Sequence, residues 1–150
     1  MLSKLRTFIS FPASSKWMFI KIAVLVPLVE FSIKTLRFKR TLRLLRRFTG
    51  STTKKCEHEL SLINRHRNQF YLYQRQFPNL GKCLARSLVL WLLLDRQGIR
   101  TELKFGVKKE GDNLLAHAWI EYKGEALVSE WELGEDFRSF PDSILPKIVE

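Results

Sequence analysis

The stretch that decides the fold is residues 83–98, which read Cys-Leu-Ala-Arg-Ser-Leu-Val-Leu-Trp-Leu-Leu-Leu-Asp-Arg-Gln-Gly. It is apolar on nearly every side until Asp95, which predicts a central buried helix of a domain. Pro78-Asn79-Leu80-Gly81 breaks the pattern before it, and Gly98 ends it.

Three strands are predicted after this helix. Over residues 99–108 apolar and charged side chains alternate, which is typical of a half-buried strand. A turn at residues 109–113 leads to a second strand over residues 114–122. Lys123-Gly124 then makes a two-residue turn into a third strand over residues 125–132. A helix followed by antiparallel strands indicates an α+β fold.

Upstream, the sequence predicts three helices. The first is a buried helix over residues 15–34, and the second is a basic, Leu- and Arg-rich helix over residues 35–48. The third covers residues 54–74. At the other end of the chain, residues 137–150 fit either a short helix or a loose tail. We divide the chain into a basic helical N-terminal lobe, 1–50, and a core, 51–150.

Charge is distributed very unevenly along the 150 residues, whose formal net charge is +11. Residues 1–50 carry eleven basic side chains and one acidic one. Residues 51–82 carry six basic and two acidic side chains, and residues 83–150 carry nine basic and twelve acidic ones. The mildly acidic C-terminal part argues against a nucleic-acid enzyme, whose positive charge would surround its site. The basic part fits an acidic partner protein or an anionic lipid surface.

The most apolar N-terminal stretch is too short to cross a membrane. Its uninterrupted part, Ile22 to Val29, has eight residues, whereas a spanning helix needs about 20. No small-residue cleavage site for a signal peptide follows it. The two cysteines cannot form a disulfide framework. We therefore expect a cytoplasmic protein, with membrane association as an alternative.

Cys83 is the candidate nucleophile. It lies at the first turn of the buried helix, where free backbone N–H groups and the helix dipole favour thiolate over thiol. The N–H groups of Cys83 or Leu84 can also hold an oxyanion, and the side-chain amide of Gln74 or Gln76 is a further candidate for that task. The alternative is an inert cysteine used as a small hydrophobe.

His117 is the candidate base. It stands in the middle of the second predicted strand, between apolar neighbours, where an imidazole is an unusual choice. A strand that follows the helix bearing the nucleophile can place its histidine against the cysteine, as in cysteine hydrolases and acyl transferases. Trp119, two residues on, either walls the site or packs the sheet.

A third group should orient the imidazole, and the hairpin register proposes Glu130. If Lys123-Gly124 is a two-residue turn, the numbers of paired residues sum to 247, and His117 lies opposite Glu130. A register slip of one residue would put Ser129 there instead. Glu121, on the same face as His117, is a weaker alternative.

No metal or cofactor site is predicted. Cys56, His58 and His66 lack the paired spacing and the fourth ligand of a zinc site. The sequence contains neither a glycine-rich phosphate loop nor a serine-nucleophile motif.

These residues together resemble one family. Cys83-Leu-x-Arg86-Ser87, Phe105-Gly-Val107, His117-Ala-Trp119-Ile-Glu121 and Gly124 are similar to the lasso-peptide leader peptidases. These enzymes belong to the transglutaminase-like superfamily of papain-like thiol enzymes. The resemblance extends over about residues 10–132, because the Trp17-led apolar segment and the basic helix also fit.

The resemblance implies a transglutaminase-like cysteine peptidase core at 51–150 with a Cys-His-acid triad. Cys83 matches the nucleophile and His117 the base. The family's acid is expected at Ser129, so the chain departs from the pattern there, with Glu130 next to it. The implied reaction removes the leader from a ribosomally made lasso-peptide precursor.

Implied partners are the leader region as substrate, a small leader-recognition protein, and a separate macrolactam synthetase that closes the ring. An anionic membrane is an additional candidate for peripheral contact, and nucleic acid is not expected. Two other functions stay open. One is a transglutaminase-like acyl transferase, and the other is a catalytically silent module that binds a peptide or a partner.

Overall fold

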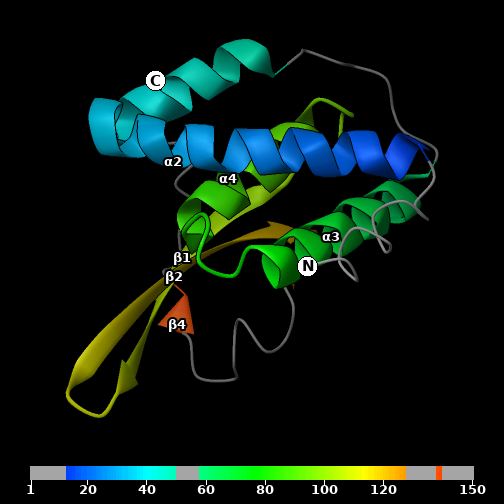
Figure 1. Ribbon diagram of the computed structural model, residues 1–150. Helices are drawn as coiled ribbons and strands as arrows, with labels where there is room; N and C mark the ends of the chain where they lie inside the picture. The colour runs from blue at the N-terminus through cyan, green and yellow to red at the C-terminus, as the bar shows by residue number, and fades with distance from the viewer. Residues whose placement is uncertain (1–12, 50–57, 128–137, 140–150) are drawn as a thin grey trace.

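The computed structural model describes residues 13–49, 58–127 and 138–139. Figure 1 shows helices gathered on one side of a small twisted sheet, whose long hairpin extends away from them. The helices are α2 (Ala13–Phe48), α3 (Glu59–Gln76) and α4 (Cys83–Asp95). The strands are β1 (Glu102–Glu110), β2 (Asn113–Tyr122), β3 (Glu125–Ala126) and β4 (Arg138–Ser139). The predicted α+β fold is confirmed.

Helix α4 is the central helix, as predicted. Every residue from Ser87 to Leu94 is buried. Helices α2 and α3 pack on α4, and β2 and β1 cover another side of it. Gly98, with a φ of 79°, closes the carboxyl end, because the left-handed conformation lets the N–H of Ile99 bond to the carbonyl of Leu94 at 3.0 Å.

Helix α2 is two helical segments that meet at Arg37, whose φ of 64° and ψ of 160° are not helical. The sequence predicts two helices here with a boundary between residues 34 and 35, and in the structure the boundary lies slightly later, at Arg37. Beyond the bend, the Phe38 ring packs edge-on against Phe105 of β1, with centroids 6.1 Å apart. The hydroxyl of Thr41 donates to the carbonyl of Arg37 at 3.1 Å.

Helix α3 begins at Glu59 and ends two residues later than predicted. Residues 54–57 of the predicted helix lie outside the described residues. The Glu59 carboxylate accepts a hydrogen bond from the hydroxyl of Tyr122 and lies 3.7 Å from the Lys123 ammonium. These contacts hold the start of α3 against the end of the hairpin.

The sheet is antiparallel with the strand order β3-β2-β1-β4. The predicted turn at Lys123-Gly124 is confirmed, since Tyr122 pairs with Glu125. The N–H of Leu127 continues this register by bonding to the carbonyl of Ile120 at 2.8 Å. Residues 128–132, the rest of the predicted third strand, lie outside the described part of the chain.

Strand β4 was not predicted. For residues 137–150 the sequence suggested a short helix or a loose tail, but residues 138–139 pair with Val107 and Gly106 of β1 instead. This strand forms because the edge of β1 is available for pairing, which is a tertiary effect. A strand of two residues is too short to show a hydrophobic periodicity in the sequence.

One hydrophobic cluster joins α2, α3, α4 and the sheet. Its buried members include Ile22 and Leu42 from the two segments of α2. The domain boundary proposed at residue 50 stays a prediction. None of the described helices has the length and apolarity that crossing a membrane requires.

Candidate active site

The position of Cys83 is fixed by the turn before it. Gly81 has a φ of +82°, and a Cβ on this residue would lie 2.2 Å from Cγ1 of Val26 in α2. Only glycine accommodates both this conformation and this close approach. Lys82, with an extended backbone, is the N-cap of α4.

Glu30 also holds this turn. Its carboxylate forms an ion pair with Lys34 at 2.9 Å and accepts a hydrogen bond from the backbone N–H of Lys82. The hydrogen bond from Lys34 and the contact with Lys82 together lower the pKa of Glu30 despite its partial burial. In the sequence Glu30 marks only the end of an apolar stretch, and nothing in the local pattern points to this contact.

The Cys83 thiol is half-buried at the first position of α4. Burial by itself raises the pKa of the thiol, because the thiolate loses solvation. The side-chain hydrogen bond with His117, its charge, and backbone hydrogen bonds from Ala118 and Leu84 act in the opposite direction and prevail. The pKa of Cys83 is therefore below its ordinary value, which is the condition for a reactive thiol.

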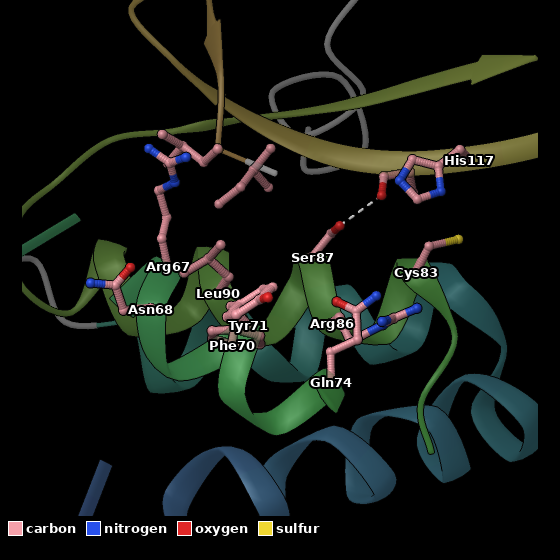
Figure 2. Close-up of a pocket in the computed structure, with 13 residues that line it drawn as sticks. Arg67, Asn68, Phe70, Tyr71, Gln74, Cys83, Arg86, Ser87, Leu90 and His117 are labelled. Atoms are coloured by element: carbon pink, nitrogen blue, oxygen red, sulfur yellow. Dashed lines mark hydrogen bonds between the residues drawn. The ribbon is translucent and has the colours of Figure 1, made fainter. Parts of the chain in front are cut away.

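His117 reaches Cys83 from the middle of β2. Figure 2 shows its ring facing the sulfur across the gap between strand and helix. Its ring is stacked on that of Trp119, with centroids 6.2 Å apart and planes 18° from parallel. The structure thus brings together the two predicted site residues, which lie 34 positions apart in the sequence.

Ser87 links α4 to β2 by a hydrogen bond next to Cys83 and His117. Its hydroxyl donates to the carbonyl of Ala118 at 2.8 Å (Figure 2). Ser87 lies one turn beyond Cys83, and Ala118 follows His117 directly. This hydrogen bond therefore limits how far the thiol and the imidazole can separate.

Of the proposed third members, only Glu121 lies among the described residues. Its carboxylate accepts the indole N–H of Trp119 at 2.9 Å and lies 4.0 Å from the Lys104 ammonium. Four strand positions separate its Cα from that of His117 by about 13 Å. Glu121 therefore holds Trp119, which is 2% exposed, and does not orient His117. Glu130 and Ser129 lie outside the described residues, so Glu130 stays a prediction.

A cavity of about 220 Å³ adjoins the cysteine, lined by α3, α4, β2 and Leu127. Cys83 and His117 lie at one end of the lining, while Arg67 and Asn68 lie toward the other (Figure 2). Of the two amide side chains proposed for the oxyanion, Gln74 lines this cavity. Gln76, in the described part of α3, is not among the lining residues.

The contribution of α3 to the cavity was not predicted from the sequence. Arg67, Phe70, Tyr71 and Gln74 line it and follow one another at spacings of three, one and three residues, which places them on one face of the helix. This spacing was visible in the sequence. The sequence did not indicate which face of this helix turns toward Cys83.

No three His, Cys, Asp or Glu side chains within residues 13–49, 58–127 and 138–139 are grouped to hold a metal ion. His66 is buried in α3, and its Nδ1 lies 2.7 Å from the carbonyl of Leu62. Burial lowers the pKa of His66, which favours the neutral ring. His58, at the start of α3, is exposed, and Cys56 lies outside the described residues.

A family model described as the transglutaminase-like superfamily matches residues 25–141, which is most of the chain. The chain belongs to the transglutaminase-like superfamily. The transglutaminase-like match begins within α2 and ends after β4, so it includes both Cys83 and His117. This superfamily contains cysteine peptidases and acyl transferases. No match to the chain was found among curated proteins or among solved structures.

Proposed function

We propose that this transglutaminase-like protein is a cysteine peptidase that removes the leader from a lasso-peptide precursor. Its substrate is the leader region, presented by a small leader-recognition protein, and a separate macrolactam synthetase then closes the ring. The superfamily match supports thiol-based acyl chemistry. The choice of substrate rests on the sequence motifs around Cys83 and His117, which resemble those of the leader peptidases.

The observation that carries the proposal is the contact between Cys83 and His117. A thiol at a helix start, with a lowered pKa and an imidazole as hydrogen-bond partner, is the arrangement that nucleophilic acyl chemistry requires. An inert cysteine in the core would have a raised pKa, because burial would act on it alone. The geometry therefore disfavours the catalytically silent binding module.

In the proposed reaction the Cys83 thiolate attacks the carbonyl carbon of the leader–core peptide bond. A C–S bond forms, and the negative charge moves to the carbonyl oxygen. The backbone N–H groups of the first turn of α4 lack partners within the helix, so they can hold this oxyanion, and Gln74 is close enough to the site to add a side-chain donor.

The C–N bond then breaks, and His117, as imidazolium, gives its proton to the leaving amine of the core peptide. Water attacks the remaining thioester, and His117 accepts a proton from this water. The products are the leader with a free carboxylate and the core with a free amine, and the thiolate is regenerated. If an amine replaces water in this second step, the same acyl-enzyme leads to acyl transfer.

The cavity beside Cys83 supports a peptide as substrate. Phe70, Leu90 and Ile120 give it apolar walls, while Arg67 and Gln74 offer hydrogen-bond donors. Such a lining of mostly apolar walls with a few polar groups is typical of ligand sites. It lies along α3 and continues from the thiol, so residues on one side of the scissile bond can occupy it.

The test is an assay of the full chain with the precursor and the leader-recognition protein, read by mass spectrometry. Cys83→Ala should abolish release of the core peptide while its circular dichroism stays unchanged. Cys56→Ala is the matched control and should retain activity. Trimming by Cys83→Ala at the wild-type rate would show that the assignment is wrong. Adding a primary amine distinguishes hydrolysis from acyl transfer, because a leader joined to that amine by an amide bond indicates a transferase.

A further inference from the structure

A row of large apolar side chains on the first segment of α2 faces away from the protein. Its members and their exposed fractions are Trp17 63%, Ile20 41%, Val24 58%, Leu28 56% and Phe31 65%. They follow one another at spacings of three, four, four and three residues, so they form a single stripe along the helix. We call this set the α2 stripe. It is about 21 Å long.

The α2 stripe is not needed for the core. The opposite face of the same segment supplies Ile22, Val26 and Val29, which are 0%, 0% and 3% exposed and pack in the hydrophobic cluster. In Figure 1 this segment crosses the front of the molecule, with α4 behind it. The helix therefore has two apolar faces, and within residues 13–49, 58–127 and 138–139 only one of them is covered.

Positive charge predominates on the helix that carries the stripe. Residues 13–49 contain nine Lys and Arg side chains and one acid, Glu30, whose carboxylate is paired with Lys34. Lys21 and Lys34 are exposed on the same segment as the stripe. Two copies of this surface would repel each other, so a second copy of the chain is a poor occupant.

The stripe leads into a basic hollow at the bend of α2. Thr35, which continues the stripe by helical spacing, lines this hollow together with Arg37, Lys39, Arg40 and Arg43. Apolar side chains and clustered cations therefore adjoin on one helix. This combination matches the two parts of an anionic phospholipid, whose acyl chains take apolar side chains and whose headgroup takes cations.

We propose that the α2 stripe and the basic hollow dock the protein peripherally on an anionic lipid bilayer. The stripe lies along a single helix, carries aromatic rings at both ends, and has lysines beside it whose ammonium groups can reach headgroups. A helix lying in the plane of a membrane has this pattern. The proposal does not depend on the chemistry at Cys83.

The test is sedimentation of the full chain with vesicles of phosphatidylcholine alone and of phosphatidylcholine mixed with phosphatidylglycerol. The chain should bind only the anionic vesicles, and added salt should weaken the binding. Leu28→Ser should weaken it about tenfold, because an exposed leucine that would insert into the bilayer is lost. Arg40→Ser and Arg43→Ser should each weaken it about fivefold.

Matched controls lie on α3. Leu60 is 67% exposed and Arg65 is also exposed, so Leu60→Ser and Arg65→Ser make the same chemical changes away from the proposed surface and should leave binding unchanged. Circular dichroism checks that each variant is folded.

Three results would overturn the proposal. The first is that the wild-type chain stays in solution with anionic vesicles at low salt. The second is that Leu60→Ser weakens vesicle binding as much as Leu28→Ser does. The third is that Leu28→Ser binds vesicles normally but no longer retains the leader-recognition protein, which would make the surface a protein interface.

Discussion

The amino end and the carboxyl end of α4 differ in what holds them. Leu88 to Leu94, toward the carboxyl end, are buried apolar residues that pack between α2 and the sheet. The amino end is held by polar and close contacts, namely Glu30 with Lys82, Gly81 with Val26, and Ser87 with Ala118. Stability and reactivity are therefore located on different parts of one helix, and substitutions should separate them.

The largest effect should come from the partner of the thiol. His117→Ala removes the first of the contacts that lower the pKa of Cys83, and it removes the proposed base. We expect the rate of leader removal to fall by about 10²- to 10⁴-fold. The pH midpoint for alkylation of Cys83 should rise, as peptide mapping of the labelled chain will show. An unchanged midpoint would mean that the imidazole does not activate the sulfur.

At the carboxyl end, Leu88→Ala should affect stability and leave the chemistry intact. Leu88 is fully buried, so the substitution leaves a cavity and should lower the free energy of unfolding by about 2–5 kcal/mol. Urea unfolding measures this change. The rate per folded molecule should stay close to that of the wild type, and a large drop in that rate would contradict the separation of the two ends.

Gly81→Ala tests the close contact behind the nucleophile. The added Cβ would lie 2.2 Å from Cγ1 of Val26, in a backbone conformation that alanine adopts poorly. We therefore expect the free energy of unfolding to fall by about 1–3 kcal/mol. Val26→Ala removes the clash but not the backbone strain. Gly81→Ala should therefore cost less in the Val26→Ala background, and equal costs in the two backgrounds would exclude the steric explanation.

The smallest effect should come from Glu30→Gln, and it depends on pH. The pKa of Glu30 is lowered in the folded protein, so this carboxylate stabilises the fold above its unfolded-state pKa, and the contribution is lost as the pH falls through the folded-state pKa. The contribution should be about 1 kcal/mol or less. Glu30→Gln should lose less stability on acidification than the wild type in urea titrations, whereas Glu125→Gln, at an exposed carboxyl, should behave like the wild type.

Local patterns explain what could be predicted. Helix α4 follows from its continuous apolar run between two breaks, and the β1–β2 hairpin follows from the alternating pattern of residues 99–108 and the turn after it. The β2–β3 register follows from Lys123-Gly124, because both residues adopt positive φ, at 52° and 84°, as a tight two-residue hairpin turn demands. Once helix α4 and the strand that carries His117 are predicted, the sequence also predicts that His117 contacts Cys83.

The features that the sequence did not predict are set by tertiary contacts. Arg37 bends α2 in a left-handed conformation for which arginine has no preference. The two residues of β4 pair because an edge is available, and Glu30 reaches Lys82 across more than 50 positions of sequence. The third member of the triad, proposed as Glu130, stays a prediction.

The missing side chain at Gly81 has a mechanical consequence. With no Cβ between them, the backbone of the turn before Cys83 packs directly against Val26, so a displacement of α2 would shift the turn that precedes the nucleophile. A ligand that shifts this helix would change the energy of the turn, and by reciprocity a substrate bound at the thiol would change the affinity of the helix for that ligand. If α2 docks on a bilayer and Cys83 receives a peptide as proposed, the two binding equilibria are linked.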